Sequence, residues 1–358
     1  MNPSARVANA CRRGIASALL AAITTSCQAQ APAPDDRELK LSVAVAPAFP
    51  LGAAAKAWSE AMAAAASGRI VTKLHPGASL AQRDAGREFF AVRDGQADLA
   101  VGSALSWSIQ LPAAGVYALP WIAPETADLA ALVAAPEVAG LVMKRAEAAG
   151  VVIVAMAPLG HRVLATVERA VRAPADLEGL RLRVTGGPAI VETLAALGAR
   201  PEAMGFVQAQ EALAAGRLDG QDGLATSFVA ARFPATGYRQ LAQLGAFGDA
   251  MLFAVRRPIW DAWTDAQRAS AVATARAVAR ETDAQGREAV AERELVAGGM
   301  GETRLTRAGV AAFSARAAGV RSARGLAVGA DLVAAAERVV ALAREAREMA
   351  GEAPAAPR

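Results

Sequence analysis

The residues best suited to binding chemistry lie in one short stretch, DLEGLRLRVTGGPAIV at residues 176–191. Leu182 and Val184 flank Arg183, so a strand here would turn its aliphatic side chains to one face and its guanidinium groups to the other. A guanidinium group matches a carboxylate through two parallel hydrogen bonds. We therefore predict an anion site for a small organic acid, anchored by Arg183. The alternative is an arginine in a salt bridge or on a solvated sheet face, which the pattern alone favours.

Such an anion site needs a helix that begins where the strand ends. The segment TGGP at residues 185–188 breaks the strand period, and residues 189–197 have a helical pattern. Pro188 suits the first turn of this helix and Gly198 its C-terminal cap. Free N–H groups at a helix start attract anions, so we expect them to lie beside Arg183.

Length and composition limit the class of protein. The 358 residues suggest about two domains, and 54% of them are hydrophobic while only 4% are aromatic. The core is therefore built mainly from Ala, Leu and Val. The formal net charge is +4, and removal of the arginines at positions 6, 12 and 13 with a leader leaves about +1. No basic stripe is present, so nucleic acid is not an expected partner.

The N-terminal segment has the pattern of a secretory signal at residues 1–27, with an arginine-bearing start and a short apolar run. This run is too short for a permanent transmembrane helix. Small residues before Cys27 resemble a bacterial lipoprotein processing site, whereas Ala29 and Ala31 offer ordinary cleavage sites. We predict export to the periplasm, a polar tether at residues 28–38, and membrane attachment only through a lipidated Cys27 or a partner protein.

Strand and helix patterns then alternate along the chain, which predicts an α/β fold with parallel sheets. The predicted strands lie at residues 39–45, 70–74, 99–101, 151–156 and 180–184. The predicted helices lie at residues 86–94, 127–148, 189–197 and 265–297, with a further Ala-rich helix through Trp58, and after a break at residues 298–305 two last helices end near Met349.

An internal repeat indicates how these elements are grouped. Four residues recur 121 positions later: Ala91, Gly95, Asp98 and Gly102 return as Ala212, Gly216, Asp219 and Gly223. The repeat predicts two similar α/β lobes with a ligand cleft between them, as in periplasmic binding proteins. We assign residues 39–159 plus about 250–285 to the first lobe, residues 160–249 plus about 286–349 to the second lobe with the C-terminal helices, and residues 350–358 to a disordered tail.

Covalent chemistry has few candidates in this sequence. Only His75 and His161 are available as bases, and they are too few for a metal cluster. Both cysteines, Cys11 and Cys27, fall within the first thirty residues, so no disulfide is expected in the fold. Dinucleotide, P-loop and nucleophile-elbow motifs are absent. We expect no enzyme activity, no metal and no cofactor; an enzyme using His161 in the cleft is the alternative.

Several short motifs, in order, resemble those of the DctP-type solute-binding proteins of tripartite ATP-independent periplasmic (TRAP) transporters. They are GRIVTKLHPGASL at residues 68–80, VRDGQAD at 92–98, ALPW at 118–121, GHR at 160–162, DLEGLRLRV at 176–184, LGARPEAM at 197–204 and ALAAGRLDGQD at 212–222. The resemblance implies two lobes joined by crossing strands and a long helix, a small organic-acid ligand between them, and the TRAP membrane subunits as partners.

The resemblance also implies roles for individual residues. Arg183 would pair with the ligand carboxylate, Arg162 would add a second contact, and Phe206 would line the pocket wall. Relatives commonly carry Glu and Tyr where this chain has Gln208 and Gln210. The candidate ligand contacts beyond the arginines and Phe206 are Gly223, Gln208 and Trp107, with Phe49, Ser103 and Thr226 as further wall positions.

These departures also affect the ligand and the role of the protein. Gly223 replaces an asparagine of sialic-acid-binding members, so sialic acid is not the expected ligand. The departures permit an alternative role, an envelope binding or signalling protein of the same fold that does not serve transport.

Overall fold

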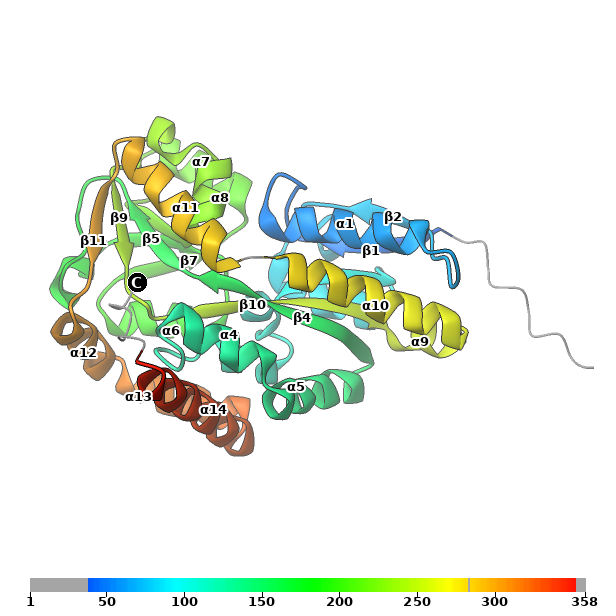
Figure 1. Cartoon of the computed structure of the whole chain (residues 1–358). Helices are drawn as coiled ribbons and strands as arrows, with labels where there is room; N and C mark the ends of the chain where they lie inside the picture. Colours follow the sequence, from blue (N-terminus) through cyan, green and yellow to red (C-terminus); the bar gives the residue numbers. More distant parts are fainter. Residues whose placement is uncertain (1–37, 283, 352–358) are drawn as a thin grey trace, which may run out of the picture. The chain divides into compact units, whose positions relative to one another are not determined.

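The computed structural model describes residues 38–282 and 284–351, which belong to a single compact unit (Figure 1). The strands of this unit form two sheets. The first has the strand order β2-β1-β3-β10-β4, and the second has the order β11-β9-β5-β8-β6-β7. Helices cover both sheets, so the predicted α/β class is confirmed.

The strands are β1 (Leu39–Val43), β2 (Thr72–His75), β3 (Leu99–Ser103), β4 (Val151–His161), β5 (Val163–Thr166), β6 (Arg181–Val184), β7 (Arg200–Ala203), β8 (Gly220–Gly223), β9 (Gln240–Gln243), β10 (Gly248–Arg256) and β11 (Gly301–Arg304). The α-helices are α1 (Pro50–Ala64), α2 (Glu88–Arg93), α3 (Ala104–Trp107), α4 (Thr126–Ala134), α5 (Pro136–Ala148), α6 (Pro188–Ala196), α7 (Phe206–Ala214), α8 (Ala225–Ala230), α9 (Arg257–Ala262), α10 (Asp265–Glu281), α11 (Ala284–Ala297), α12 (Arg307–Arg316), α13 (Ala318–Val328) and α14 (Ala330–Met349). Short 3-10 helices lie at Ser79–Ala81, Ala85–Arg87, Pro112–Ala118, Pro174–Leu177 and Phe233–Thr236.

The two sheets share one pairing pattern. In the first sheet, β1 is parallel to β2 and β3, and β3 is antiparallel to β10. In the second sheet, β6 is parallel to β7 and β8, and β8 is antiparallel to β5. The chain passes from one sheet to the other where β4 leads into β5 and where β9 leads into β10. Figure 1 shows the paired strands β4 and β10 running side by side toward the second sheet.

The internal repeat has a physical basis in this pattern. Asp98, just before β3, accepts a hydrogen bond from the backbone N of Lys40 in β1 at 3.0 Å. Asp219, just before β8, accepts one from the backbone N of Arg181 in β6 at 2.8 Å. Each aspartate therefore joins its own strand to the parallel neighbour.

The repeat extends to one further pair of residues. A Cβ atom at Gly102 would lie 2.1 Å from the ring of Trp107, and one at Gly223 would lie 2.4 Å from the ring of Phe228. Trp107 and Phe228 are themselves 121 positions apart. Both lobes thus pack an aromatic ring on a glycine near the end of a strand, which is β3 in the first lobe and β8 in the second.

Two predicted helices are each divided in the structure. The predicted helix at 127–148 is two helices, α4 and α5, which meet at an angle of 61°. Pro136 begins α5, and a proline lacks the N–H that would continue the preceding helix. The predicted helix at 265–297 is α10 followed by α11, with Thr282 in an extended conformation after α10. Of the described helices, none is by itself long and apolar enough to cross a membrane.

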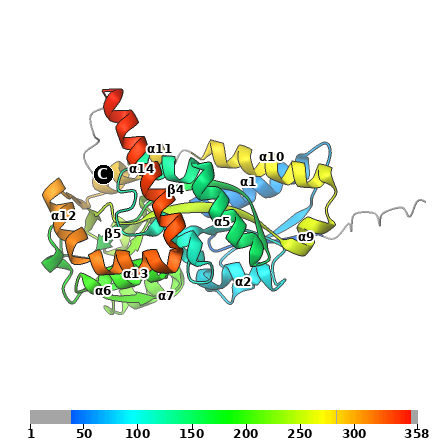
Figure 2. The ribbon, with the colours of Figure 1, turned by 90° about the horizontal axis from the view of Figure 1, so that it is seen from below.

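The C-terminal part contains three helices rather than two, and the last of them packs with the first sheet. Leu332, Ala335 and Val340 of α14 are buried in the same cluster as Leu129 of α4 and Val142 of α5. Figure 2 shows α14 beside α5. The predicted grouping of residues 286–349 with the second lobe therefore differs from the observed packing of α14, because its apolar face fits the core of the first sheet.

Candidate ligand-binding site

Arg183 lies on β6 with its side chain almost buried, at 8% exposure. Leu182 and Val184 point into a core cluster on the opposite face, as the alternation predicts. The Arg183 Nε donates to the carbonyl oxygen of Met204 at 3.0 Å. Within residues 38–282 and 284–351, no carboxylate lies within ion-pair distance of its guanidinium group. Burial lowers the pKa of Arg183, with the charge of Arg162 acting in the same direction and that of Asp222 against it.

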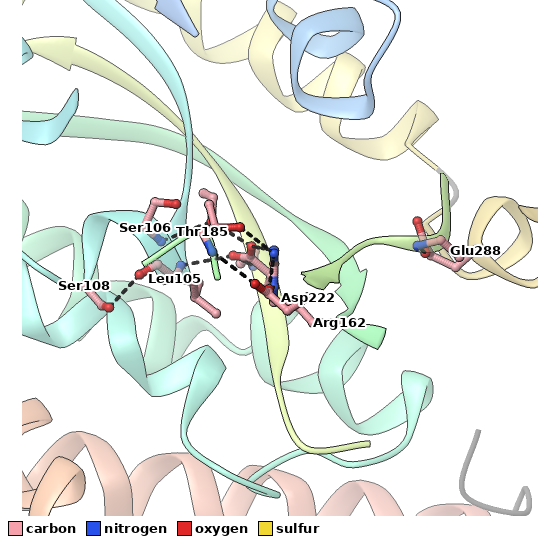
Figure 3. A network of polar contacts seen from close by, with 11 residues as sticks. Leu105, Ser106, Ser108, Arg162, Thr185, Asp222 and Glu288 are labelled. Carbon is pink, nitrogen blue, oxygen red and sulfur yellow. Dashed lines mark hydrogen bonds and ion pairs between the residues drawn. The ribbon is translucent and has the colours of Figure 1, made fainter. Parts of the chain in front are cut away.

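Arg162 is buried to the same degree as Arg183, but its guanidinium group is paired with neighbouring polar side chains (Figure 3). Its guanidinium group donates to Asp222 and, through Nη2, to the hydroxyl of Thr185 at 2.7 Å. Its Nη1 lies 3.6 Å from a carboxylate oxygen of Asp249. The role of Arg162 as a second ligand contact stays a prediction. In the described part of the protein, the residue joins the junction of β4 and β5 to β8, to the loop after β6 and to β10.

The carboxylate of Asp249 extends this network into the first sheet. It accepts from the hydroxyl of Ser103 at 2.7 Å and from the backbone N of Leu105 at 3.1 Å. Burial raises the pKa of Asp249, and the positive charge of Arg162 opposes that shift. The network therefore fixes the end of β3 and the start of α3 relative to the junction of β4 and β5.

The helix start beside Arg183 is that of α7 rather than that of α6. Residues of α6 pack on the face of β6 that carries Leu182 and Val184. In the loop before α6, the N–H of Thr185 donates to Asp222 at 3.0 Å, and Pro188 has no N–H. Met204, which accepts from Arg183, lies two residues before Phe206, the first residue of α7. The positive end of the α7 dipole therefore adds to the favourable field for an anion near Arg183.

The first turn of α7 supplies one aromatic wall. The ring of Phe206 contacts the ring of Phe49, which precedes α1, edge to face at 5.7 Å between centroids. Both rings are partly exposed. Gln208 is exposed, and its side-chain oxygen accepts from the backbone N of Gly205 at 3.2 Å. Gln208 thus caps α7, while Phe206 and Phe49 close one side of the site.

The other residues predicted to contact the ligand make packing contacts or hydrogen bonds inside the protein. Trp107 is fully buried against Phe89, and its indole N–H donates to Glu88 at 3.3 Å. Gly223 is covered by the ring of Phe228. The hydroxyl of Thr226 donates to Glu288, as that of Ser103 donates to Asp249. We leave these four residues, Trp107, Gly223, Thr226 and Ser103, out of the proposed site.

The structure adds two residues beside Arg183 that sequence reasoning missed. Gln221 is the neighbour of Arg183 in the register of β8 and β6, and it is fully buried. Tyr238 is also fully buried, and the charge of Arg183 opposes the burial that raises the pKa of this tyrosine. In the sequence, only Gln221 gives a signal, as a glutamine in the segment GQDG of the repeat. That segment is equally compatible with a solvated loop.

The candidate base His161 can also be placed. His161 is bonded through Nε2 to the carbonyl oxygen of Ala123 at 2.7 Å, and burial lowers its pKa. It lines a hollow together with Arg162, Gln243 and Glu288. Cys27, the predicted lipidation site, lies outside the described residues.

Comparison with known proteins agrees with this architecture. A TRAP periplasmic solute-binding protein from Ralstonia eutropha H16, solved with bound (S)-2-acetolactate, has a TM-score of 0.81 and 36% sequence identity over 85% of this chain and 98% of that chain. A TRAP solute-binding protein from Bordetella bronchispeptica shares the fold at a TM-score of 0.73 and 22% identity over 84% of this chain and 98% of that chain. These relatives are binding proteins of the two-lobed type that the resemblance implied.

Two curated relatives match about half of this chain. The uncharacterized protein y4mM of Sinorhizobium fredii is 32% identical over 176 residues, 49% of this chain and 32% of its own length. The solute-binding protein RD1_1052 of Roseobacter denitrificans is 31% identical over 175 residues, 47% of this chain and 51% of its own length. The match thus spans no more than about half of either relative.

A family model matches a longer stretch of this chain than either curated relative does. The family model described as bacterial extracellular solute-binding protein, family 7 (DctP) matches residues 41–319, well over half of the chain. The chain therefore belongs to the DctP family of bacterial extracellular solute-binding proteins.

Proposed function

We propose that this protein is the solute receptor of a TRAP transporter, which captures a small organic acid in the periplasm and delivers it to the membrane subunits. Family membership supports the receptor role. The organic acid bound to the relative from Ralstonia eutropha supports the ligand class. Lipid attachment through Cys27 and the two lobe ranges, 39–159 plus about 250–285 and 160–249 plus about 286–349, stay predictions within this proposal, except for α14, which packs with the first sheet.

The observation that carries the proposal is the contrast between the two buried arginines. Arg162 is neutralised by Asp222 and Asp249, whereas the guanidinium of Arg183 has only one hydrogen bond to the described protein, through Nε to a carbonyl oxygen. A buried cation without a counter-ion is costly, since burial disfavours the charged form. A ligand carboxylate would supply the missing charge and accept two parallel hydrogen bonds.

The ligand would then lie between Arg183 and the aromatic pair of Phe49 and Phe206. Phe206 follows Met204 by two positions, and Met204 accepts from the Arg183 Nε. The carboxylate end of an acid would face the guanidinium and its apolar part the rings. Arg162 would act indirectly in this arrangement, because it holds Asp222 and the loop after β6 in place.

Substitution of Arg183 tests the proposal. Arg183→Ala should weaken binding of the cognate acid by about 2–5 kcal/mol, because one partner of a buried charge pair is removed. The acid is first found by a thermal-shift screen of organic acids, and its affinity is then measured by isothermal titration calorimetry. Arg183→Lys should retain part of the affinity, since it keeps the charge but loses the planar fork.

Arg181→Ala provides a matched control on the same strand. Arg181 is partly exposed and already paired with Asp219 at 2.7 Å, so its loss should leave affinity unchanged. Unaltered affinity in a folded Arg183→Ala protein, judged by its thermal unfolding, would contradict the proposal.

A further inference from the structure

Beside Arg183 lies a glutamine whose side chain has no partner in the described part of the protein. Gln221 is fully buried, and both its amide nitrogen and its amide oxygen lack a hydrogen bond. It is paired in register with Arg183 on one side and with Ala165 on the other. Neighbouring strands lie about 4.8 Å apart and paired residues point to the same face, so the amide lies next to the arginine side chain.

Tyr238 presents a second unpaired polar group at the same place. Its hydroxyl is buried and has no partner within residues 38–282 and 284–351. The ring stacks on Phe233 at 4.2 Å, and Phe233 stacks on Phe228 at 4.2 Å, so the position of the hydroxyl is fixed by packing. Tyr238 packs in the same cluster as Ala165, the other register neighbour of Gln221.

Helix α7 contributes a third group. The side-chain nitrogen of Gln210 is buried and unpaired with respect to the described residues. Gln210 follows Phe206 by one helical turn and precedes Leu213 by three positions, and both of these residues pack on the cluster of Tyr238. Gln210 therefore lies on the face of α7 that covers Tyr238.

These groups are rich in donors. The amides of Gln221 and Gln210, the hydroxyl of Tyr238 and the two terminal nitrogens of Arg183 offer more N–H and O–H donors than acceptors, which are the two amide oxygens and the hydroxyl oxygen. An unpaired amide or hydroxyl inside a protein lowers stability, so buried polar groups usually have a hydrogen-bond partner. The complementary partner is a ligand group with several oxygen atoms close together.

We infer that Gln221 and Tyr238, assisted by Gln210, form a subsite for an oxygen substituent next to the carboxylate that Arg183 holds. The preferred ligands are then short 2-oxo or 2-hydroxy monocarboxylates. A second carboxylate is not favoured, because the other buried arginine, Arg162, is already paired with Asp222 and Asp249. This inference rests on the proposed function, since it needs Arg183 as the carboxylate anchor.

Calorimetry with matched acids tests the subsite. The probes are 2-oxobutyrate and 2-hydroxybutyrate, each compared with butyrate, which differs only in lacking the oxygen substituent. The wild-type protein should bind the substituted acids at least about tenfold more tightly, the value of one good hydrogen bond. Tyr238→Phe removes only the hydroxyl and keeps the aromatic stack, and Gln221→Met removes the amide at nearly constant volume. Each variant should lose about tenfold of this preference and retain its affinity for butyrate.

Gln243→Met is the matched control, because Gln243 is a buried glutamine on β9 of the same sheet, separated from β6 by two strands. It should retain the full preference. Equal binding of butyrate and the substituted acids by the wild-type protein would overturn the subsite and leave the proposed function standing. Full preference in both Tyr238→Phe and Gln221→Met would do the same. Absence of binding to any organic acid by the wild-type protein would overturn both.

Discussion

The two buried arginines of this protein show how the surroundings of a side chain decide its role. Arg162 and Arg183 are equally buried, at 8% exposure. Arg162 stands where β4 leads into β5, in reach of Asp222 and Asp249, and its charge is used to join strands. Arg183 stands on β6 and faces uncharged side chains such as Gln221 and Tyr238. Only the second arrangement leaves a charge for a ligand.

Burial also changes the protonation of individual carboxyl groups. Glu88 on α2 accepts from the hydroxyl of Ser42 at 2.8 Å and from the indole N–H of Trp107. Burial raises its pKa to about 7, although these two hydrogen bonds oppose the shift. Burial likewise raises the pKa of Glu288 to about 7. Both carboxyls are therefore mainly protonated in the folded protein only below about pH 7.

Such groups make stability depend on pH. A carboxyl whose pKa is higher in the folded state stabilises the fold fully below its unfolded pKa of about 4.3, and this contribution is lost as pH rises through about 7. Glu88→Gln keeps the shape and removes the titration. The fall in the free energy of unfolding between pH 5 and pH 8 should therefore be smaller in the variant, by an amount on the order of 3 kcal/mol.

Urea unfolding at the two pH values measures this difference. Glu60→Gln is the control, because Glu60 is an exposed carboxylate on α1, and it should follow the wild-type curve. An identical fall with pH in Glu88→Gln and the wild-type protein would show that Glu88 does not titrate in this range.

Among the strands, the repeat explains why β3 and β8 each carry a glycine at or next to their last residue. Trp107 packs on Gly102 and Phe228 packs on Gly223, in two sheets with the same pairing pattern. Phe228 cannot move aside easily, because it is stacked on Phe233. A side chain at Gly223 is therefore disfavoured by packing.

Gly223→Ala should accordingly destabilise the fold. The added Cβ would lie 2.4 Å from the Phe228 ring, and overpacking of this kind costs about 1–3 kcal/mol. Chemical denaturation gives the loss, and in a Phe228→Leu background the same substitution should cost less. Gly140→Ala, at an exposed position of α5 with no atom within 4 Å of the new Cβ, should be neutral or stabilise by about 0.5–1 kcal/mol. A Gly223→Ala protein as stable as the wild type would contradict the packing argument.

At the scale of the whole molecule, the last helix is held on the first sheet by charge as well as by its apolar face. Asp128 on α4 is fully buried, and it accepts from Arg344 at 2.6 Å and from Arg347 at 2.5 Å, both on α14. After completing the second sheet, the chain thus returns to the first sheet. The C-terminal helix α14 is thereby joined to α4, which lies more than 200 residues earlier in the sequence.

Asp128→Ala should lower the free energy of unfolding by about 2 kcal/mol. The loss is smaller than the ~3–5 kcal/mol expected for a fully buried pair, because both arginines are partly exposed and regain water. Glu337→Ala, which removes a surface ion pair between α14 and α13, should cost at most ~1 kcal/mol. Urea denaturation of the two variants makes the comparison, and equal losses would show that the buried carboxylate has no special role.

Local features of this protein follow from its amino-acid sequence alone. Alternation of Leu182, Arg183 and Val184 predicted which side chains leave the core face of β6, and the 121-residue repeat predicted two related α/β lobes. These features depend on residues close in the chain, whose side-chain directions follow from strand geometry.

Which polar residues are paired, and which are left for a ligand, depends on the assembled fold. Arg162 meets Asp222 across 60 positions of sequence, and Glu88 meets Trp107 inside the core. Short strands such as β8, with the sequence GQDG, carry no propensity that predicts a buried central strand. Pairing and burial arise from contacts between distant segments, so the same glutamine or arginine is compatible with a surface, a salt bridge or a binding site until the sheets are assembled.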